Sequence, residues 1–309
     1  MRRSSRSPLL ALAVAVGLVV VACAGSDVAG PKRADAPTSA PPTTPATADP
    51  GPPTTEATTT APPPTELPTT TAAPAPPPKS TVAPVFPASP NPPRTVDPAT
   101  PLRIHALGDS TAFSIGWGVA RAAGASGLGT TTVDARTSTG LTRNDYFDWP
   151  SHLLMLVPAP PEVAVVSFGA NDTQPLVRPD GSVVPFPEPG WREEYARRVE
   201  GVMTLLTGIG TRVYWVGQPI ARDPGYSDRM RVLDDVYREV LGRYPGATYV
   251  DASQWLSDDA GAYTDVLPGP DGAPVTIRDD DGIHLSPAGG DYLGTVVLNQ
   301  ILADHGVAR

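Results

Sequence analysis

The feature that most restricts how this sequence can fold is a long segment without aromatic residues near its N-terminus. Proline, threonine and alanine dominate residues 24 to about 97, and no aromatic residue occurs between Cys23 and Phe86. Such a segment buries too little apolar surface to offset the entropy lost on ordering, so we expect a disordered chain with polyproline character. A folded core is therefore expected in residues 98–309, which are sufficient for one domain.

The residues before this segment have the pattern of a bacterial lipoprotein leader. Arginines precede an apolar run over residues 9–22 that is short for a membrane span, and small residues precede Cys23, the only cysteine. A single cysteine forms no intramolecular disulfide, which favours lipidation at this position. We expect residues 1–22 to be a cleaved signal peptide and residues 23–97 to be a lipidated stalk. A plain signal peptide or an uncleaved anchor helix is the alternative.

This organisation predicts an extracytoplasmic domain that is anchored by lipid to the cell membrane and faces the cell wall. The net charge is −9, and removal of the three leader arginines makes the remaining chain more acidic. Without a cluster of Lys and Arg, an acidic chain is a poor ligand for nucleic acid or for anionic lipid headgroups. We therefore expect no nucleic-acid partner, and contact with the membrane through the lipid anchor alone.

Short apolar runs alternate with longer amphipathic segments from Leu102 onward. Strands are expected at residues 102–107, 131–135, 162–168, 212–216 and 248–251. Helices are expected at residues 111–123, 145–156, 191–207 and 227–243, and from Ser286 onward. This alternation predicts an α/β domain, a parallel sheet with helices on both faces. In such sheets the functional groups gather at the carboxyl ends of the strands.

Three loops that follow predicted strands carry polar residues suited to acyl transfer. Ser110 follows the first strand and opens a helix, where it is either an exposed nucleophile or an ordinary helix N-cap. Asn171 follows the third strand and offers an amide to an oxyanion, or serves a simple turn. Asp281 precedes His284 by three positions, which suits a carboxylate that orients an imidazole, or a solvated acidic loop. The acidic run lacks the spacing of a calcium loop, so no metal is expected.

These motifs, in this order, resemble those of the SGNH (GDSL-like) hydrolase family. The matching blocks are Gly108-Asp109-Ser110, Gly169-Ala170-Asn171-Asp172 and Asp281-Gly282-Ile283-His284. The segment from Thr137 to Pro150 resembles a bacterial subgroup, the DUF459 type, and the resemblance extends from about Leu102 to Gly306. Thr111 stands where the family often has leucine.

The resemblance implies a three-layer α/β/α sandwich with a five-stranded parallel sheet, the flavodoxin-like SGNH fold. It implies that Ser110 is the nucleophile, His284 the general base and acid, and Asp281 the residue that orients the imidazole. It implies an oxyanion hole formed by the N–H groups of Ser110 and Gly140 and by the side chain of Asn171. We expect no cofactor.

For other residues, the sequence gives weaker indications of a functional role. Arg143 follows the oxyanion glycine and is either a substrate-binding residue or part of a surface salt bridge. Trp117, Trp149 and Trp191 are expected in the core more than at a sugar-binding surface. The histidines at positions 105, 152 and 305 are expected to be structural or exposed. The proline-rich residues 173–190 are a candidate roof over the site.

Taken together, the sequence predicts a serine esterase that acts on acyl esters, with O-acetyl groups of a cell-wall or surface polysaccharide as the expected substrate. An O-acyltransferase would use the same residues, with a polysaccharide hydroxyl as acceptor and a membrane protein as acyl donor. A non-catalytic carbohydrate-binding lipoprotein is the alternative from another class, because a fold alone does not establish activity.

Overall fold

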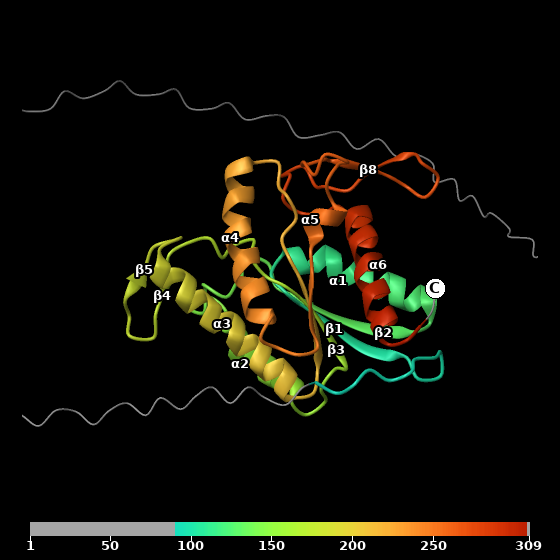
Figure 1. Ribbon diagram of the computed structural model, residues 1–309, viewed down its shortest axis with the longest axis horizontal. Helices are drawn as coiled ribbons and strands as arrows, with labels where there is room; N and C mark the ends of the chain where they lie inside the picture. Colours follow the sequence, from blue (N-terminus) through green and yellow to red (C-terminus); the bar gives the residue numbers. More distant parts are fainter. Residues whose placement is uncertain (1–89, 308–309) are drawn as a thin grey trace, which may run out of the picture. The chain divides into compact units, whose positions relative to one another are not determined.

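The computed structural model describes residues 90–307 (Figure 1). The predicted signal peptide, Cys23 and most of the predicted stalk lie outside these residues. Within the described part of the chain, no helix is both long enough and apolar enough to cross a membrane.

The elements alternate along the chain as the sequence predicts. The strands are β1 (Leu102–Gly108), β2 (Gly129–Ala135), β3 (Val163–Ser167), β4 (Leu176–Val177), β5 (Val183–Val184), β6 (Arg212–Val216), β7 (Ala247–Val250), β8 (Val266–Pro268) and β9 (Pro274–Thr276). The helices are α1 (Thr111–Ser126), α2 (Trp149–Leu153), the 3₁₀ helix η1 (Leu154–Leu156), α3 (Pro189–Gly208), α4 (Pro224–Leu241), α5 (Ala252–Trp255) and α6 (Pro287–Asp304).

Five strands form one parallel sheet in the order β2-β1-β3-β6-β7. Every residue of the central strand β3 is buried, as expected for an apolar strand covered on both faces. Gly108 lies opposite both Ala135 and Ser167, so β1, β2 and β3 end at the same edge. The loops that follow these strands are therefore neighbours, which fulfils the first condition for a shared site.

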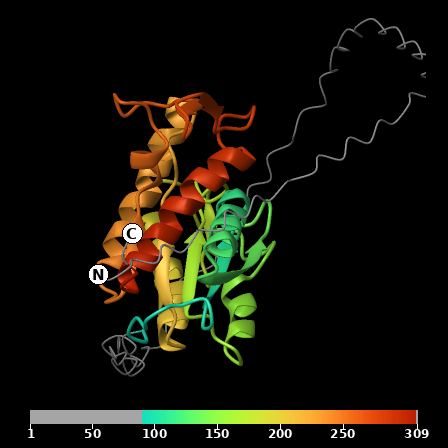
Figure 2. The same cartoon turned by 90° about the vertical axis from the view of Figure 1, so that its right-hand side faces the viewer.

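Two apolar clusters occupy the two faces of the sheet and confirm the three-layer α/β/α fold. Helices α2, α3 and α4 bury side chains against one face, together with Leu107, Phe168 and Trp215. Helices α1 and α6 cover the other face, together with Ile104 and Ala106. Figure 2 shows α6 crossing the strands diagonally.

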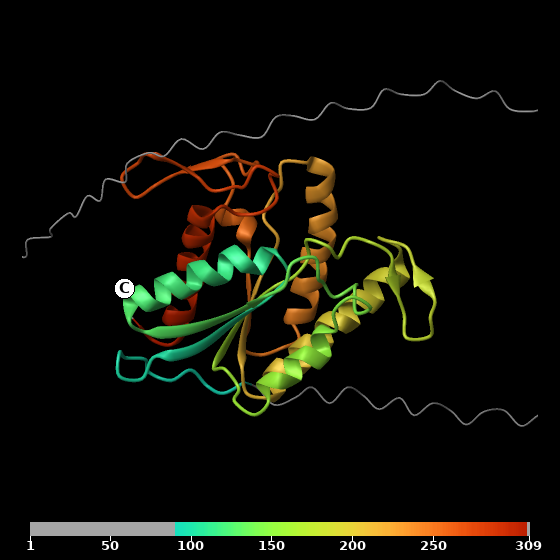
Figure 3. The same ribbon diagram turned by 180° about the vertical axis from the view of Figure 1, so that it is seen from behind.

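Helices α1 and α6 make direct backbone contact on their face of the sheet. A Cβ atom on Gly118 would lie 1.9 Å from the carbonyl oxygen of Gly290, so only glycine permits this approach. The contact brings α1, which begins directly after Ser110, against α6, which begins shortly after His284. The small hairpin β8–β9 lies beside the start of α6, as seen from the front and from behind (Figures 1 and 3).

One expected helix is much shorter than the sequence pattern indicates. Residues 145–156 were expected to be helical, but α2 begins only at Trp149. The carboxylate of Asp148 caps it by accepting a hydrogen bond from the N–H of Ser151, and Pro150 occupies the first turn. The preceding residues instead form a turn in which Arg143 accepts backbone hydrogen bonds. The short hairpins β4–β5 and β8–β9 were not predicted.

The folded region includes residues 90–97, which composition assigns to the stalk. Arg94 forms an ion pair of 2.5 Å with Glu162, and Val96 is buried. The N–H of Asn91 donates to the carbonyl oxygen of Gly210. These contacts with distant segments are the physical reason why the packed region begins before the composition changes.

Candidate active site

Ser110 lies on the tight turn between β1 and α1, at the carboxyl edge of the sheet. Gly108 makes this turn with a φ of +147°, and a Cβ atom there would lie 1.8 Å from the Ser167 carbonyl oxygen. Ser110 occupies the N-cap position of α1, but its side chain makes no capping hydrogen bond. The Asp109 carboxylate instead accepts from the N–H of Thr111 at 2.9 Å. The Ser110 hydroxyl is therefore available for another partner.

That partner is His284, 174 residues further along the chain. The Ser110 Oγ lies 2.8 Å from His284 Nε2, and His284 Nδ1 lies 2.5 Å from Asp281 Oδ2. The hydrogen bond to Asp281 places the ring proton on Nδ1 and leaves Nε2 to accept from Ser110. The three residues thus form a continuous Ser–His–Asp chain with the geometry of an activated nucleophile.

Asp281 is held in its ionised form by local hydrogen bonds. Its second oxygen accepts from the N–H groups of Ile283 at 2.8 Å and His284 at 2.9 Å. Burial alone would raise the pKa of Asp281, but the hydrogen bonds from the His284 ring and these N–H groups outweigh burial and lower the pKa to about 2. A carboxylate in this state stabilises the imidazolium that forms when His284 takes a proton.

A buried arginine that sequence analysis did not single out supports the Asp281–His284 loop. Arg278 donates to the carbonyl oxygen of Ile283 in this loop at 3.5 Å, and to those of Ile220 at 2.8 Å and Leu256 at 3.3 Å on neighbouring loops. Burial lowers the pKa of Arg278 to about 10. Arg222 supports the same loop from outside, because its side chain donates to the Asp280 carbonyl oxygen at 2.7 Å. A sequence offers no local signal for either role, since the partners lie on other loops.

Asp109 joins the nucleophile turn to the Asn171 loop. One carboxylate oxygen accepts from the N–H and hydroxyl of Thr111, and the other accepts from the N–H groups of Gly169 at 2.7 Å and Ala170 at 2.9 Å. Burial raises the pKa of Asp109 to about 6, although hydrogen bonds from Thr111 oppose this shift. Asp109 is thus a positioning residue within the Gly108–Ser110 block.

Asp172 forms the second connection, between the Asn171 loop and the segment that contains Gly140. It accepts from the N–H and hydroxyl of Thr142, each at 2.9 Å, and from the hydroxyl of Tyr195 at 2.7 Å. Burial raises the pKa of Asp172. A Cβ atom on Gly140 would lie 2.2 Å from the Asp172 carboxylate, so this packing requires glycine at position 140.

Ser110, Asn171 and His284 line one cavity of about 380 Å³. The Asn171 amide donates one hydrogen bond to the Thr139 carbonyl oxygen at 2.9 Å, which orients it and leaves its second N–H available. Gly140 is buried and does not line this cavity, whereas the neighbouring Ser138 does, with a left-handed φ of +62°. Within residues 90–307, the N–H groups of Ser110 and Gly140 have no hydrogen-bond acceptor.

Two predicted features lie away from this cavity. Arg143 forms a two-pronged ion pair with Asp145, at 3.0 and 3.2 Å, and does not line the cavity. The structure therefore supports the interpretation of Arg143 as part of a surface salt bridge. Residues 173–190 do not roof the cavity either, because Leu176 and Val184 are buried in the core beside Trp191.

The remaining histidines and tryptophans separate into structural and exposed groups. His152 lies 2.5 Å from Asp134, His105 lies near the same carboxylate, and the His305 ring contacts the carbonyl oxygen of Arg94. Trp149 and Trp191 are fully buried, as expected. Trp117 is exposed instead, beside the candidate site, because its position on α1 faces away from the sheet.

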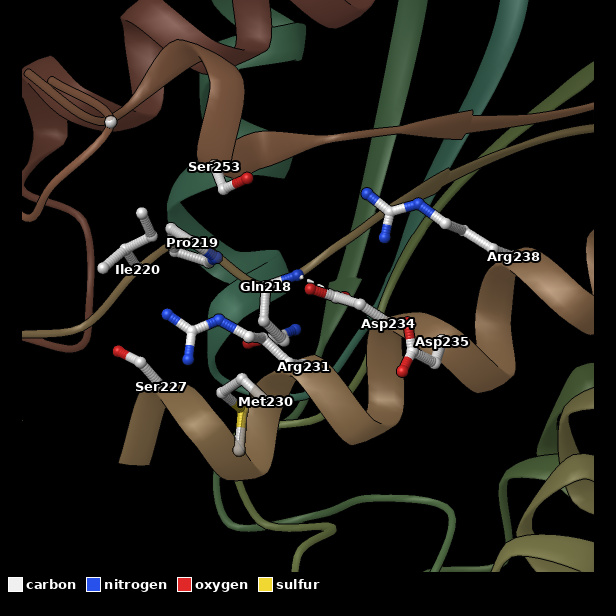
Figure 4. Close-up of a pocket in the computed structure, with 11 residues that line it drawn as sticks. Gln218, Pro219, Ile220, Ser227, Met230, Arg231, Asp234, Asp235, Arg238 and Ser253 are labelled. Carbon is white, nitrogen blue, oxygen red and sulfur yellow. Dashed lines mark hydrogen bonds between the residues drawn. The ribbon is translucent and has the colours of Figure 1, made fainter. Parts of the chain in front are cut away.

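A second cavity, of about 420 Å³, lies between α4 and the loop after β6 (Figure 4). It contains Ser227 and Ser253, but the hydroxyl of Ser227 bonds to the Ala221 backbone and that of Ser253 to Asp251. No histidine lines it. The buried carboxylate of Asp234 accepts from the Gln218 N–H at 3.0 Å. This cavity therefore lacks an activated nucleophile.

In the part of the chain that the structure describes, no group of His, Cys, Asp and Glu is arranged to hold a metal ion.

The fold and the site together define a three-layer α/β protein with a Ser–His–Asp chain at the carboxyl edge of its sheet. The family model described as "Protein of unknown function (DUF459)" matches residues 103–300, and the chain belongs to this family. No curated protein matches the chain.

Several solved structures are similar in their chain arrangement. A GDSL-like lipase from Bacteroides thetaiotaomicron is 13% identical with a TM-score of 0.43, covering 65% of this chain and 88% of its own. A carbohydrate esterase of family 3 from Talaromyces cellulolyticus is 11% identical with a TM-score of 0.44, covering 67% and 100%. An acetyl xylan esterase from Butyrivibrio proteoclasticus is 10% identical with a TM-score of 0.42, covering 66% and 64%.

Proposed function

We propose that this protein is a serine esterase that removes short acyl groups, chiefly acetyl, from a carbohydrate at the cell surface. The observation that carries the proposal is the Ser110–His284–Asp281 chain, with distances of 2.8 and 2.5 Å, opening on a cavity at the sheet edge. A non-catalytic binding protein would have no need of a serine hydroxyl freed from capping and aligned with a histidine.

The first half of the reaction acylates Ser110. The Ser110 Oγ attacks the carbonyl carbon of the ester while its proton passes to His284 Nε2, and Asp281 stabilises the resulting imidazolium. The Ser110 N–H and the free amide N–H of Asn171 bind the oxyanion, with the Gly140 N–H as the third donor implied by the family resemblance. His284 then protonates the leaving sugar oxygen as the carbon–oxygen bond breaks.

The second half releases the acyl group. Water attacks the acyl-enzyme while His284 Nε2 takes its proton, and that proton returns to Ser110 Oγ as the carboxylic acid leaves. A sugar hydroxyl in place of water would make the same residues an O-acyltransferase, supplied by a membrane acyl-donor protein. Transfer of acetyl to an added oligosaccharide acceptor distinguishes the transferase from the esterase.

The polar lining of the cavity supports a carbohydrate ester with a short acyl group. Seven of its eight lining residues are polar, and Phe113 is the apolar one. Phe113 is the one apolar side chain in this lining that can pack against an acyl group, which suits a short group such as acetyl. Sugar hydroxyls find partners in the hydroxyls of Thr137 and Ser138, whereas the Ser114 hydroxyl donates to the Leu285 carbonyl oxygen at 2.9 Å.

The test compares the full-length chain with its Ser110→Ala variant on p-nitrophenyl acetate, with and without an oligosaccharide acceptor. We expect fluorophosphonate labelling and turnover in the wild type, and a loss of about 10⁴- to 10⁶-fold in kcat in the variant. Ser253→Ala, which changes a serine in the other cavity, is the matched control and should retain turnover. Acetyl appearing on the acceptor would identify a transferase. Equal rates in wild type and Ser110→Ala, with no labelling, would contradict the enzyme proposal.

We infer the cell-surface location from the predicted leader and the predicted lipidation of Cys23. Incorporation of a labelled fatty acid into the wild type, and its loss in Cys23→Ser, is the result that this proposal requires. A Cys23→Ser protein that remains labelled would contradict it.

A further inference from the structure

Phe113 and Trp117 form an exposed aromatic pair on α1, next to the nucleophile. Their side chains are 52% and 45% exposed, whereas Trp149, Trp191 and Trp215 are completely buried. The two rings meet edge to face, with centroids 6.4 Å apart and planes inclined by 68°. Phe113 also lines the cavity that contains Ser110 and His284. Phe113 thus lies at the cavity, and Trp117 continues the aromatic surface beyond it along the outer side of α1.

Helical geometry explains this continuity. Trp117 lies seven residues after Ser110, which is about two turns, or roughly 10 Å, along the helix axis. Phe113 lies between them, so a substrate whose ester reaches Ser110 can extend over both rings. One turn beyond Trp117, the Arg121 guanidinium pairs with Asp291 of α6 at 2.5 Å, and both side chains are about half exposed. The aromatic surface therefore ends at a polar pair able to bond to hydroxyl groups.

We propose that Phe113 and Trp117 form a platform on which a neutral sugar ring of the substrate packs while its ester group occupies the cavity at Ser110. This inference rests on the proposed esterase function and names the subsite that selects its substrate. A sugar ring presents an apolar C–H face to an aromatic ring and hydroxyl groups at its edge. The apolar pair beside the hydroxyls of Thr137 and Ser138 matches both features.

Two other ligands fit this surface less well. A long acyl chain would require apolar contacts on several sides, but Phe113 is the only apolar side chain that lines the cavity itself. An acidic sugar would approach the carboxylate of Asp279, which also lines the cavity, and would be repelled by it. A neutral, acetylated oligosaccharide remains as the ligand that the platform selects.

The test measures substrate preference in the full-length chain. Acetylated xylo-, cello- and chito-oligosaccharides are compared with p-nitrophenyl acetate and p-nitrophenyl octanoate. In Trp117→Ala and Phe113→Ala, the ratio of kcat/KM on an acetylated oligosaccharide to kcat/KM on p-nitrophenyl acetate should fall about five- to tenfold, mainly through KM. Trp255→Ala removes a tryptophan of similar exposure, 43%, from a surface away from the cavity and is the matched control.

Each outcome decides the proposal. A ratio that changes no more in Trp117→Ala than in Trp255→Ala overturns it, and a selective loss on p-nitrophenyl octanoate assigns the pair to an acyl chain instead. Binding provides a second measurement: isothermal titration calorimetry should detect binding of the deacetylated forms of these oligosaccharides to Ser110→Ala, and their Kd should rise about five- to tenfold when Trp117→Ala is added to that variant. Turnover of p-nitrophenyl acetate, with neither deacetylation nor binding of the oligosaccharides, would overturn the platform and leave the esterase proposal intact. Failure of the esterase itself is recognised separately by the absence of serine labelling.

Discussion

Asp109 and Asp281 are two aspartates of one site whose pKa values shift in opposite directions. Asp109 is fully buried, and burial raises its pKa to about 6. Asp281 is about half exposed, and hydrogen bonds from His284 and neighbouring N–H groups lower its pKa to about 2. The difference separates two tasks: the buried carboxyl joins loops, whereas the exposed carboxylate supplies a negative charge to the imidazole.

Replacement of the exposed carboxylate should have the largest effect on catalysis. Asp281→Asn keeps the shape of the side chain but presents an amide to His284, which removes the charge and disturbs the ring tautomer. We expect kcat to fall about 10⁴-fold, while the urea midpoint of unfolding stays near that of the wild type. Steady-state kinetics and urea unfolding monitored by fluorescence measure both quantities. A large loss of stability with full activity in the surviving folded fraction would reverse the roles assigned to the two aspartates.

Replacement of the buried carboxyl should lower the stability of the fold, and activity should fall as a consequence. Asp109→Ala leaves the N–H groups of Thr111, Gly169 and Ala170 without their acceptor inside the protein. We expect the free energy of unfolding to fall by about 3 kcal/mol, and activity to fall with it as the two loops separate. Asp145→Ala is the control, because that exposed carboxylate pairs with the Arg143 guanidinium at the surface. Unchanged stability in Asp109→Ala would show that the loops are held by other contacts.

The pH dependence of stability distinguishes the same two groups. The ordinary pKa of an aspartate is 3.8, and the folded-state pKa of Asp109 is raised to about 6. The contribution of Asp109 to the free energy of unfolding is therefore full below about pH 4. It is lost as pH rises through about 6, a change of about 3 kcal/mol. The lowered pKa of Asp281 acts in reverse: its contribution is present above about pH 4 and is lost as pH falls through about 2.

Carboxyl carbon chemical shifts, followed by NMR between pH 2 and pH 8, measure these pKa values directly. We expect the Asp281 carboxyl to titrate near pH 2 and that of Asp109 near pH 6. Urea unfolding at the same pH values checks the sign of each contribution. Titration of both groups near pH 4 would remove the distinction between them.

The smallest effect is expected at Arg143. Its guanidinium pairs with the exposed Asp145 carboxylate and does not line the catalytic cavity. Exposed ion pairs contribute little because water and salt screen them. In Arg143→Ala we therefore expect kcat/KM on acetylated oligosaccharides to stay within about twofold of the wild type. A tenfold rise in KM would instead make Arg143 a substrate-binding residue.

Much of the fold follows from local sequence pattern. The strand predicted at residues 212–216 has the bounds observed for β6, and the apolar run at residues 162–168 contains the fully buried β3. Alternation of such strands with amphipathic helices is sufficient to predict a parallel sheet covered on both faces. Local pattern fails at residues 145–156, where the capping carboxylate of Asp148 and the following proline start the helix late.

The identity of the site residues was also determined by the sequence, because Ser110, Asn171 and the Asp281–His284 pair follow strands in the order of a known family. Their partners were decided only by the tertiary structure. Whether Ser110 caps α1 or meets His284 depends on two segments 174 residues apart, and the helix cap is supplied by Asp109. Likewise, Trp117 and Trp149 are the same residue type, yet only Trp117 faces solvent beside the site. Hydrophobic periodicity is a property of neighbouring residues, whereas hydrogen-bond partners and exposure are set by packing between distant ones.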